Sequence, residues 1–366
     1  MRVALVHDYL TQYGGAERVL EAFADVFPRA PIFTLMYDER GTRSIFSGRR
    51  IITSFLQRFK VVRRHHRFFP PLMPMAIEQF DLSKYDLVIS NSASFAKGII
   101  TRPETLHICY CHTPTRFAWD NSHRYVEEFG GYPSIMRKIA PIFLNWLRVW
   151  DHTASLRPDV FIANSYHVRK RIRKYYSQDA EVIYPPVRVK YFSRIARAPK
   201  DFFLMVGRLI AYKRFDLGIE AAKELGFNLH IVGDGPEMKK LKRIARGAPN
   251  ITFIGATDDE RLRQEYATCR ALIFPQEEDF GLVAVEAMAA GTPVIAWRGG
   301  GALETVQDGR TGILFNEQTH HALIDAIKQF KEEDFSTEYI KEYSNNFDQE
   351  VFNQKVKSFI DKQLTK

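Results

Sequence analysis

The sequence has few cysteines and no long hydrophobic run. Only three of its 366 residues are cysteines, and Cys109, Cys111 and Cys269 form neither a zinc-binding spacing nor a disulfide framework. We expect buried, reduced thiols in a cytosolic protein. No stretch approaches the roughly 20 apolar residues that a transmembrane helix needs. The first ten residues, MRVALVHDYL, lack the apolar centre of a secretory signal and indicate a strand instead.

Two ligand-binding signatures are also missing. The loop after the first strand carries Gly14 and Gly15, but not the G-x-G-x-x-G spacing with an acidic residue at the end of a second strand, which disfavours a dinucleotide-dependent dehydrogenase. No Asp-x-Asp pair stands at a strand end where it could hold a metal ion. We therefore expect no resident cofactor and no required metal.

Positive charge is concentrated in the first half of the chain. The formal net charge is +9 overall. Residues 1–197 hold 30 Lys and Arg against 17 Asp and Glu, a net of +13, whereas residues 198–366 hold 22 against 26, a net of −4. The first half is therefore the half expected to meet an anionic partner.

Strand-like apolar runs alternate with amphipathic helical patterns through most of the chain, which is typical of parallel sheets covered by helices. The predicted strands are residues 2–7, 30–36, 86–91, 107–111 and 159–165, then 202–207, 228–233, 251–255, 271–275 and 293–297. We predict an α/β protein with two doubly wound domains, residues 1–190 and 191–345. Residues 346–366 are predicted to form a C-terminal helix that packs back on the first domain. Two such sheets facing each other would form a ligand-binding cleft at the carboxyl ends of their strands.

The stretch QEEDFGLVAVEAMAAGTPVIA, residues 276–296, places Glu278 and Glu286 on either side of a Phe-Gly break. A helix is predicted to begin at Gly281, after a strand, and to stop at Gly291. Its first amide groups can bind a phosphate, and flanking carboxylates can accept hydrogen bonds from sugar hydroxyls on both sides, which suits a sugar nucleotide. Acids solvated at a helix start are the alternative explanation.

Other loops at predicted carboxyl ends could complete this site. The stretch after residue 207 contains Arg208 and Lys213, which could neutralise a diphosphate, although a solvated basic cluster would look similar. The turn at Gly233 allows the backbone to approach a ligand closely. In the first half, the Gly14 and Gly15 loop allows a helix N-terminus to meet a diphosphate.

In this order the motifs resemble the retaining glycosyltransferases of family 4, which have the GT-B architecture of two facing Rossmann-like domains. The stretches GRLIAYKRFD, VGDGPE, FIG and the two glutamates with seven residues between them carry the resemblance, which is densest between 202 and 310. It implies that Arg208 and Lys213 hold the diphosphate, Glu278 the hexose and Glu286 the ribose. It also implies that the backbone of Phe280, Gly281, Leu282 and Val283 contacts sugar and phosphate.

The stretch CHTPTRFAWD, residues 111–120, resembles bacterial mannosyltransferases that use GDP-mannose to build surface polysaccharides. The resemblance places His112 beside the donor sugar. The stretch IANSYHVRKRI also matches the family and makes Ser165 a candidate donor-binding residue, with helix capping as its alternative role. It implies transfer of mannose to a lipid-linked or oligosaccharide acceptor in O-antigen, lipopolysaccharide or exopolysaccharide synthesis. A UDP-sugar donor, a sugar-nucleotide epimerase and a non-catalytic sensor remain alternatives.

The stretch from residue 48 to 75 mixes Arg and Lys with Phe, Leu, Ile and Met. It suits an amphipathic segment at an anionic membrane surface, which would have the protein work as a peripheral protein at the inner face of the cell membrane. A core-packed helix with a solvated basic face is nearly as good an explanation. A nucleic-acid-binding site is the least supported hypothesis, because no binding motif accompanies the charge. We expect neutralisation of Arg63, Arg64 and Arg67 to weaken binding to anionic vesicles.

Overall fold

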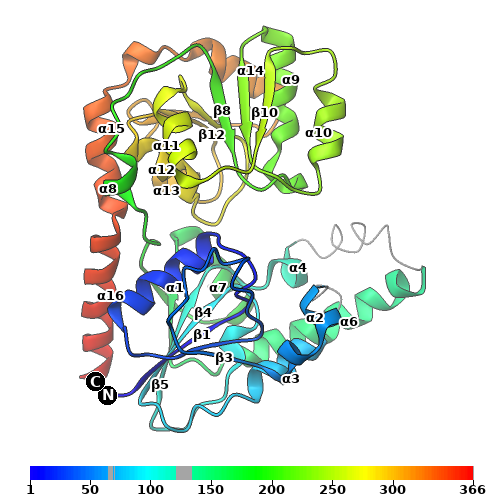
Figure 1. The fold of residues 1–366 in the computed structure, drawn as a ribbon, viewed down its shortest axis with the longest axis vertical. Helices are drawn as coiled ribbons and strands as arrows, with labels where there is room; N and C mark the ends of the chain where they lie inside the picture. The colour runs from blue at the N-terminus through cyan, green and yellow to red at the C-terminus, as the bar shows by residue number, and fades with distance from the viewer. Residues whose placement is uncertain (65–68, 70, 121–133, 366) are drawn as a thin grey trace. The chain divides into compact units, whose positions relative to one another are not determined.

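The computed structural model describes residues 1–64, 69, 71–120 and 134–365. The chain divides into two compact units. Unit 1 is residues 1–184 together with 353–366, and unit 2 is residues 185–352. Unit 2 thus begins at Pro185, near the expected boundary at 190, and the C-terminal segment is grouped with unit 1 (Figure 1).

Unit 1 contains a parallel sheet of seven strands in the order β3-β2-β1-β4-β5-β6-β7. The strands are β1 (Val3–His7), β2 (Ile32–Thr34), β3 (Ile51–Thr53), β4 (Leu87–Ser92), β5 (Leu106–Cys111), β6 (Val160–Ala163) and β7 (Ala180–Val182). The helices are α1 (Gly15–Val26), η1 (Phe55–Arg58), α2 (Lys60–Arg64), α3 (Leu72–Glu78), η3 (Ala96–Gly98), α4 (Arg116–Trp119), α6 (Ser134–Ala154) and α7 (Tyr166–Tyr176).

Unit 2 contains a second parallel sheet, of six strands in the order β10-β9-β8-β11-β12-β13. The strands are β8 (Phe203–Val206), β9 (Leu229–Val232), β10 (Ile251–Gly255), β11 (Leu272–Phe274), β12 (Val294–Trp297) and β13 (Gly312–Phe315). The helices are α8 (Val189–Phe192), η5 (Ala211–Lys213), α9 (Phe215–Leu225), α10 (Met238–Ile244), α11 (Asp259–Thr268), α12 (Leu282–Ala289), α13 (Ala302–Thr305), α14 (His320–Gln329), η6 (Glu332–Asp334), α15 (Thr337–Ser344) and η7 (Asn345–Phe347). The last helix, α16 (Gln349–Leu364), begins in unit 2 and ends in unit 1.

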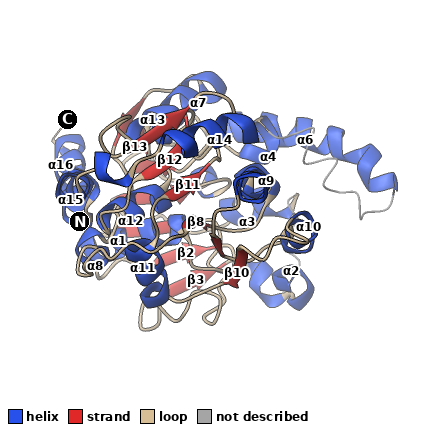
Figure 2. Ribbon diagram, turned by 90° about the horizontal axis from the view of Figure 1, so that it is seen from above, coloured by secondary structure: helices blue, strands red, loops and turns tan. Residues whose placement is uncertain are grey.

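Helices cover both faces of the sheet in unit 2 (Figure 2). On one face α9 and α14 bury Phe215, Leu217, Leu323 and Ile324 against strand residues such as Ile231. Each fully buried side chain of this size stabilises the fold by roughly 1.5–3 kcal/mol before entropy is counted. On the other face α12 is enclosed by α8, α11 and α15, which explains why its sequence, LVAVEAMA, has no polar stripe.

All ten predicted strands are present, and the doubly wound α/β prediction is confirmed. The three strands that were not predicted, β3, β7 and β13, are all edge strands of three or four residues. Such strands lack a long apolar run because one side of each has no neighbouring strand. The prediction for residues 48–75 was incomplete, since Ile51–Thr53 pairs with β2 inside the sheet of unit 1. Arg67 lies outside the described residues.

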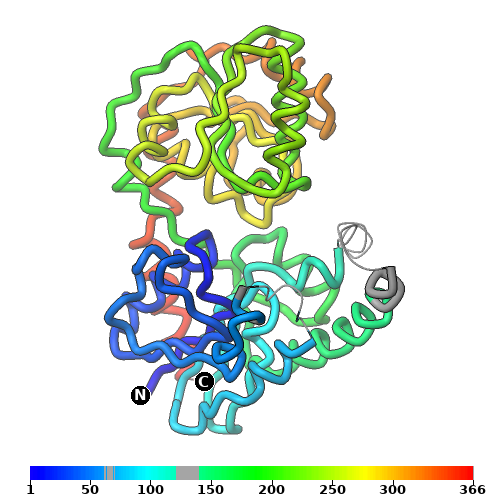
Figure 3. The backbone as a smooth tube through the Cα atoms, turned by 45° about the vertical axis from the view of Figure 1, so that its right-hand side comes forward, coloured from blue at the N-terminus to red at the C-terminus, as the bar shows by residue number. Residues whose placement is uncertain are grey.

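The tube in Figure 3 follows the chain from unit 1 into unit 2 and back again at the C-terminal end. Val356 and Ile360 of α16 are buried, in agreement with their grouping in unit 1. All three cysteines are buried and form no disulfide, and burial raises the pKa of the Cys109 and Cys269 thiols to about 12. Such thiols remain protonated near neutral pH.

Candidate functional site

An ion pair stands at the carboxyl edge of the sheet in unit 2. Lys213 ends η5, after β8, and Glu278 lies in the loop after β11. These two strands are neighbours in the sheet, so their following loops meet. The Nζ atom of Lys213 lies 2.8 Å from Oε1 of Glu278, and the two side chains are only 13% and 19% exposed. The structure therefore brings together two of the four predicted catalytic residues.

Two glycines allow close packing around Lys213. A Cβ atom on Gly207 would lie 2.9 Å from the Lys213 ammonium nitrogen, so a larger residue there would push the lysine away. A Cβ atom on Gly233 would lie 1.9 Å from the Gly207 carbonyl oxygen, and Gly233 has a φ of +134°. The loops after β8 and β9 can approach this closely only because residue 233 is glycine. Arg208 lies in the same loop after β8 and is exposed.

Helix α12 begins next to Glu278. It starts at Leu282, one residue later than predicted, with Gly281 in the left-handed conformation at its N-cap, φ +91°. The first amide groups of a helix have no partner within that helix, so the amides at Leu282 and Val283 are suited to receiving a phosphate. The ring of Phe280 packs on Phe347 and the residue is 3% exposed, so its side chain is not available for a ligand contact.

A glycine run that sequence reasoning missed supports this loop. The amide of Gly301, after β12, donates a hydrogen bond of 2.8 Å to the Glu278 carbonyl oxygen. Cβ atoms on Gly300 and Gly301 would lie 2.4 Å from backbone atoms of Glu278 and Phe280. The stretch GGG at residues 299–301, directly after a strand, was the available signal for a close backbone contact.

The second glutamate is placed differently. Glu286 lies on α12 with 2% of its surface exposed, and its Oε2 accepts a 2.9 Å hydrogen bond from the hydroxyl of Tyr266 on α11. Tyr266 is fully buried. A ribose could reach Glu286 only at its small exposed edge. Sequence reasoning did not find Tyr266, because no local pattern shows that α11 packs on α12.

In unit 1 the two-glycine loop leads into α1. Gly14 is the N-cap residue, and its amide donates to Oε2 of Glu17 at 2.8 Å. Glu17 therefore already places a carboxylate at this helix start. Its Oε1 lies 3.4 Å from Nε2 of His7. Burial disfavours a charge on His7, but the hydrogen bond and charge of Glu17, together with Asp8, outweigh burial and raise the pKa of His7.

His112 follows β5 and is held from two sides. Its Nε2 lies 2.6 Å from Oδ1 of Asn91, at the end of β4. Its carbonyl oxygen accepts from the Asn164 amide at 3.0 Å, and its ring packs edge-on against Tyr110, with centroids 5.2 Å apart. Ser165, next to Asn164, is fully buried, and its hydroxyl accepts from the amide of Val168. The capping alternative for Ser165 is therefore present in the structure.

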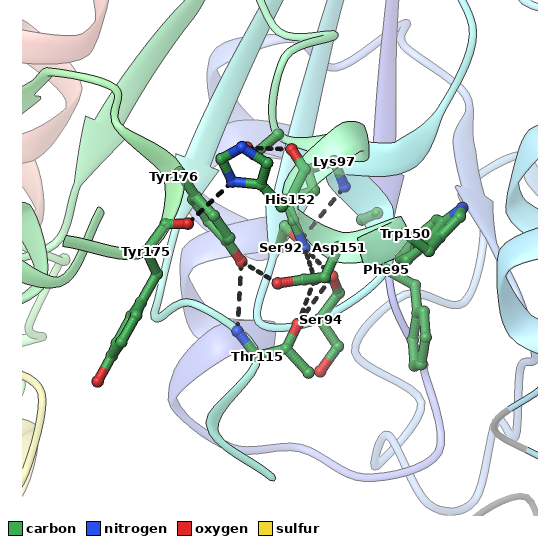
Figure 4. A network of polar contacts seen from close by, with 12 residues as sticks. Ser92, Ser94, Phe95, Lys97, Thr115, Trp150, Asp151, His152, Tyr175 and Tyr176 are labelled. Carbon is green, nitrogen blue, oxygen red and sulfur yellow. Dashed lines mark hydrogen bonds and ion pairs between the residues drawn. The ribbon is translucent and has the colours of Figure 1, made fainter. Parts of the chain in front are cut away.

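The loop that carries His112 is connected to α6 by hydrogen bonds to the carboxylate of Asp151 (Figure 4). This carboxylate is fully buried. It accepts hydrogen bonds from the hydroxyls of Thr115 and Tyr176, at 2.7 and 2.8 Å, and from the indole of Trp119, at 2.8 Å. Its Oδ1 also lies 2.5 Å from the buried ammonium of Lys97.

These contacts change the interpretation of the stretch CHTPTRFAWD. Thr115 and Trp119 hold the loop in place through Asp151, and Asp120 pairs with Arg171 and accepts from the hydroxyl of Tyr175. Three of the ten residues in this stretch, Thr115, Trp119 and Asp120, thus have a structural role. The stretch therefore says less about the sugar donor than its resemblance to mannosyltransferases implies.

Two further features of unit 2 involve none of the predicted site residues. A cavity of about 320 Å³ lies near the amino ends of β8 and β9, beside Phe202, His230 and Glu265. Within the described part of the chain, the donor atoms of Glu224, His320 and His321 lie within 4.8 Å of one another, close enough to share a metal ion.

A parallel sheet whose carboxyl edge carries the Lys213 and Glu278 pair beside a helix start is typical of the class of proteins that bind nucleotide-linked ligands. Two family models support this class. Residues 13–191 match the model "Glycosyltransferase Family 4", and residues 190–347 match "Glycosyl transferases group 1". The chain belongs to glycosyltransferase family 4.

Individual relatives agree with this family. The chain is 31% identical over 177 residues to an uncharacterized glycosyltransferase of Methanocaldococcus jannaschii, MJ1178, covering 48% of this chain and 50% of the relative. It is 29% identical over 161 residues to a GDP-mannose-dependent alpha-(1-6)-phosphatidylinositol monomannoside mannosyltransferase of Mycobacterium tuberculosis, covering 40% and 42%. The chain thus spans half or less of the length of these curated relatives.

Solved structures match over nearly the whole chain. HepE of Anabaena, solved in complex with UDP and glucose, is similar with a TM-score of 0.71 and 20% identity, covering 99% of each chain. This similarity confirms the predicted GT-B fold.

Proposed function

We propose that the protein is a retaining hexosyltransferase that moves mannose from GDP-mannose to a lipid-linked or oligosaccharide acceptor in surface polysaccharide synthesis. The observation that carries the proposal is the Lys213 and Glu278 pair beside the start of α12. The mycobacterial relative, whose name gives GDP-mannose as its donor, supports the choice of sugar donor. A UDP-sugar donor is the second candidate, because HepE was solved with UDP and glucose.

In this proposal the cations act on the leaving group. Cleavage of the bond between the anomeric carbon and phosphate leaves negative charge on the diphosphate. Arg208, Lys213 and the amides at residues 281–283 would stabilise that charge, and a single well-placed donor of this kind is typically worth about 100- to 1,000-fold in rate. Lys213 is poised for this role because Glu278 holds its ammonium in a mostly buried position.

We assign the remaining predicted residues to ligand binding. Glu278 and His112 would contact the transferred hexose, Glu286 the ribose, and Gly15, Gly233 and Phe280 would allow the backbone to approach. Retention would follow front-face attack, in which the leaving phosphate helps to deprotonate the acceptor, with no covalent glycosyl-enzyme. Trapping such an intermediate with a slow substrate would contradict this route.

The deciding experiment incubates the protein with GDP-mannose, UDP-glucose and UDP-N-acetylglucosamine and measures the nucleoside diphosphate released. We expect fastest release from GDP-mannose, and no loss of activity in EDTA, because Arg208, Lys213 and the α12 amides supply the positive charge. Preference for a UDP-sugar would select the second candidate. Formation of an epimer of the sugar nucleotide would indicate an epimerase, and binding without turnover would indicate a sensor.

We also propose that unit 1 binds an anionic membrane surface that carries the acceptor. Helix α6 exposes Ile142, Trp146 and Val149 at 71%, 45% and 62%, with the i, i+4, i+7 spacing of one helix face. Phe59 and Val61 are also more than half exposed, in a segment that includes the exposed Arg63. No helix in the described ranges combines the length and apolar character that crossing a bilayer requires.

Vesicle flotation tests the membrane proposal. Ile142→Ser, Trp146→Ser and Val149→Ser combined should reduce recovery with phosphatidylglycerol vesicles several-fold, and Arg63→Gln should reduce it more weakly. Leu364→Ser, on another exposed helix position, is the matched control and should bind as the parent does. Equal recovery of all variants would indicate that the exposed apolar face of α6 has no role in membrane binding.

A further inference from the structure

A chain of buried polar groups connects His112 to the start of α1. Asn91 is fully buried, and His7 and Glu17 are 2% and 5% exposed. His112 and His7 contact opposite ends of the Asn91 amide, at 2.6 and 2.9 Å. His7 then contacts Glu17, whose other carboxylate oxygen accepts from the amide of Gly14.

Strand order brings these residues together. His7, Asn91 and His112 stand at the carboxyl ends of β1, β4 and β5, which are consecutive in the sheet of unit 1. His7 and Asn91 are direct partners in the register between β1 and β4. The three side chains are therefore fixed relative to one another by the parallel sheet.

The surroundings of Asn91 determine which way its amide points. Its nitrogen lies 2.8 Å from the backbone carbonyl oxygen of Ala16, which can only accept a hydrogen bond. The amide oxygen therefore faces His112. Since that oxygen can also only accept, Nε2 of His112 must carry the proton, and Nδ1 of the neutral ring is then a hydrogen-bond acceptor.

We propose that Asn91 is a positioning residue, which fixes the proton of His112 on Nε2 and so makes Nδ1 the atom that accepts a hydrogen bond from a hydroxyl of the bound sugar. The inference rests on the proposed contact between His112 and the transferred hexose. His7 and Glu17 act indirectly. Glu17 contacts His7, and His7 in turn contacts the Asn91 amide that positions His112.

Two substitutions of Asn91 should have different effects. Asn91→Leu keeps most of the volume but leaves Nε2 without its acceptor, and we expect transfer to slow about 10- to 100-fold at all pH values. Asn91→Asp keeps the acceptor that faces His112 and adds a negative charge, which raises the pKa of His112. Its second carboxylate oxygen would face the Ala16 carbonyl oxygen, so this variant should also be less stable than the parent. Protonated His112 would donate from Nδ1 instead of accepting, so transfer should slow at neutral pH and recover as pH rises.

The test combines a measurement without substrate and a measurement with it. In full-length protein labelled with ¹⁵N-histidine, the His112 signals are assigned by their absence in His112→Gln, and each variant is titrated. We expect an Nε2-protonated ring in the parent, and a rise of at least one unit in the pKa of His112 in Asn91→Asp. The acidic limb of its pH–rate profile should shift by the same amount. Circular dichroism checks that each variant is folded.

Asn164→Leu is the matched control, because Asn164 contacts the backbone oxygen of His112 and not its ring. It should leave the pKa of His112 unchanged. An Nδ1-protonated ring in the parent, or an unchanged pKa in Asn91→Asp, would overturn the inference whatever the activity. If the ring behaves as expected while the parent transfers no sugar from any nucleotide, the proposed function fails and the proton assignment stands.

Discussion

The ammonium of Lys213 and the carboxylate of Glu278 are 65 residues apart in sequence and 2.8 Å apart in unit 2. Each follows the carboxyl end of one of two neighbouring parallel strands. The pair sits where doubly wound sheets bind their ligands. A mostly buried lysine next to an acid is held in position before any ligand arrives, which suits a group that must stabilise a departing diphosphate.

Removal of Lys213 should affect turnover far more than stability. We expect Lys213→Ala to lower the rate of sugar transfer about 100- to 1,000-fold, because a positioned cation for the leaving group is lost. Released nucleoside diphosphate provides the measurement. Lys239→Ala, at an exposed lysine of α10, should retain the parent rate. Retention of more than a third of the rate by Lys213→Ala would argue against the assignment.

Gly281 should not tolerate a side chain. Alanine there must adopt a φ near +91°, and its Cβ would lie 3.0 Å from the ring of Phe274. Gly226, with φ +73° and no atom near its Cβ position, isolates the backbone strain alone. In urea unfolding we expect Gly226→Ala to cost about 1 kcal/mol and Gly281→Ala to cost more. Only Gly281→Ala should also weaken binding of the sugar nucleotide. If both variants lose the same stability and bind the sugar nucleotide equally well, Gly281 has no special role in ligand binding.

Asp151 should be important for the stability of unit 1. Asp151→Asn leaves the Lys97 ammonium buried without its counter-charge, and breaking such a pair typically costs about 3–5 kcal/mol. Lys97→Met should cost less, since Asp151 would keep its hydrogen bonds from Thr115, Trp119 and Tyr176. Free energies from urea unfolding, with the exposed Asp325→Ala as control, measure these differences. A cost below 1 kcal/mol for Asp151→Asn would contradict the described network.

His107 should make the protein less stable in mild acid. Burial lowers the pKa of His107 to about 3 in the folded state, against about 6.5 in the unfolded chain. Below pH 6.5 the unfolded chain takes up a proton that the folded protein does not, so stability falls as pH falls toward 3. One such histidine contributes about 2 kcal/mol of loss between pH 7.5 and 5.0.

The comparison of urea unfolding at pH 7.5 and 5.0 measures this contribution. His107→Gln should lose about 2 kcal/mol less than the parent over this interval, whereas His321→Gln, at an exposed position, should lose as much as the parent. His7, whose pKa is raised, contributes in the opposite direction, so only the difference between variant and parent is informative. Identical losses would mean that His107 is protonated in the folded state.

Central strands were predictable because buried parallel strands have continuous apolar runs, as in FLMV and VIAW. The proximity of Lys213 and Glu278 followed from the rule that loops at carboxyl strand ends meet. The contact between Glu286 and Tyr266 could not be anticipated, since it depends on how α11 packs on α12. Nor could the Asn91 network, because it requires the strand order that places β4 between β1 and β5.

Unit 1 is not built from one continuous piece of chain, since residues 353–366 belong to it. During synthesis the first 184 residues therefore leave the ribosome without the segment that carries Val356 and Ile360, both buried in the finished protein. Unit 1 can reach its final form only after the whole of unit 2 has been translated. Removal of residues 353–366 would thus damage the unit that is translated first of the two.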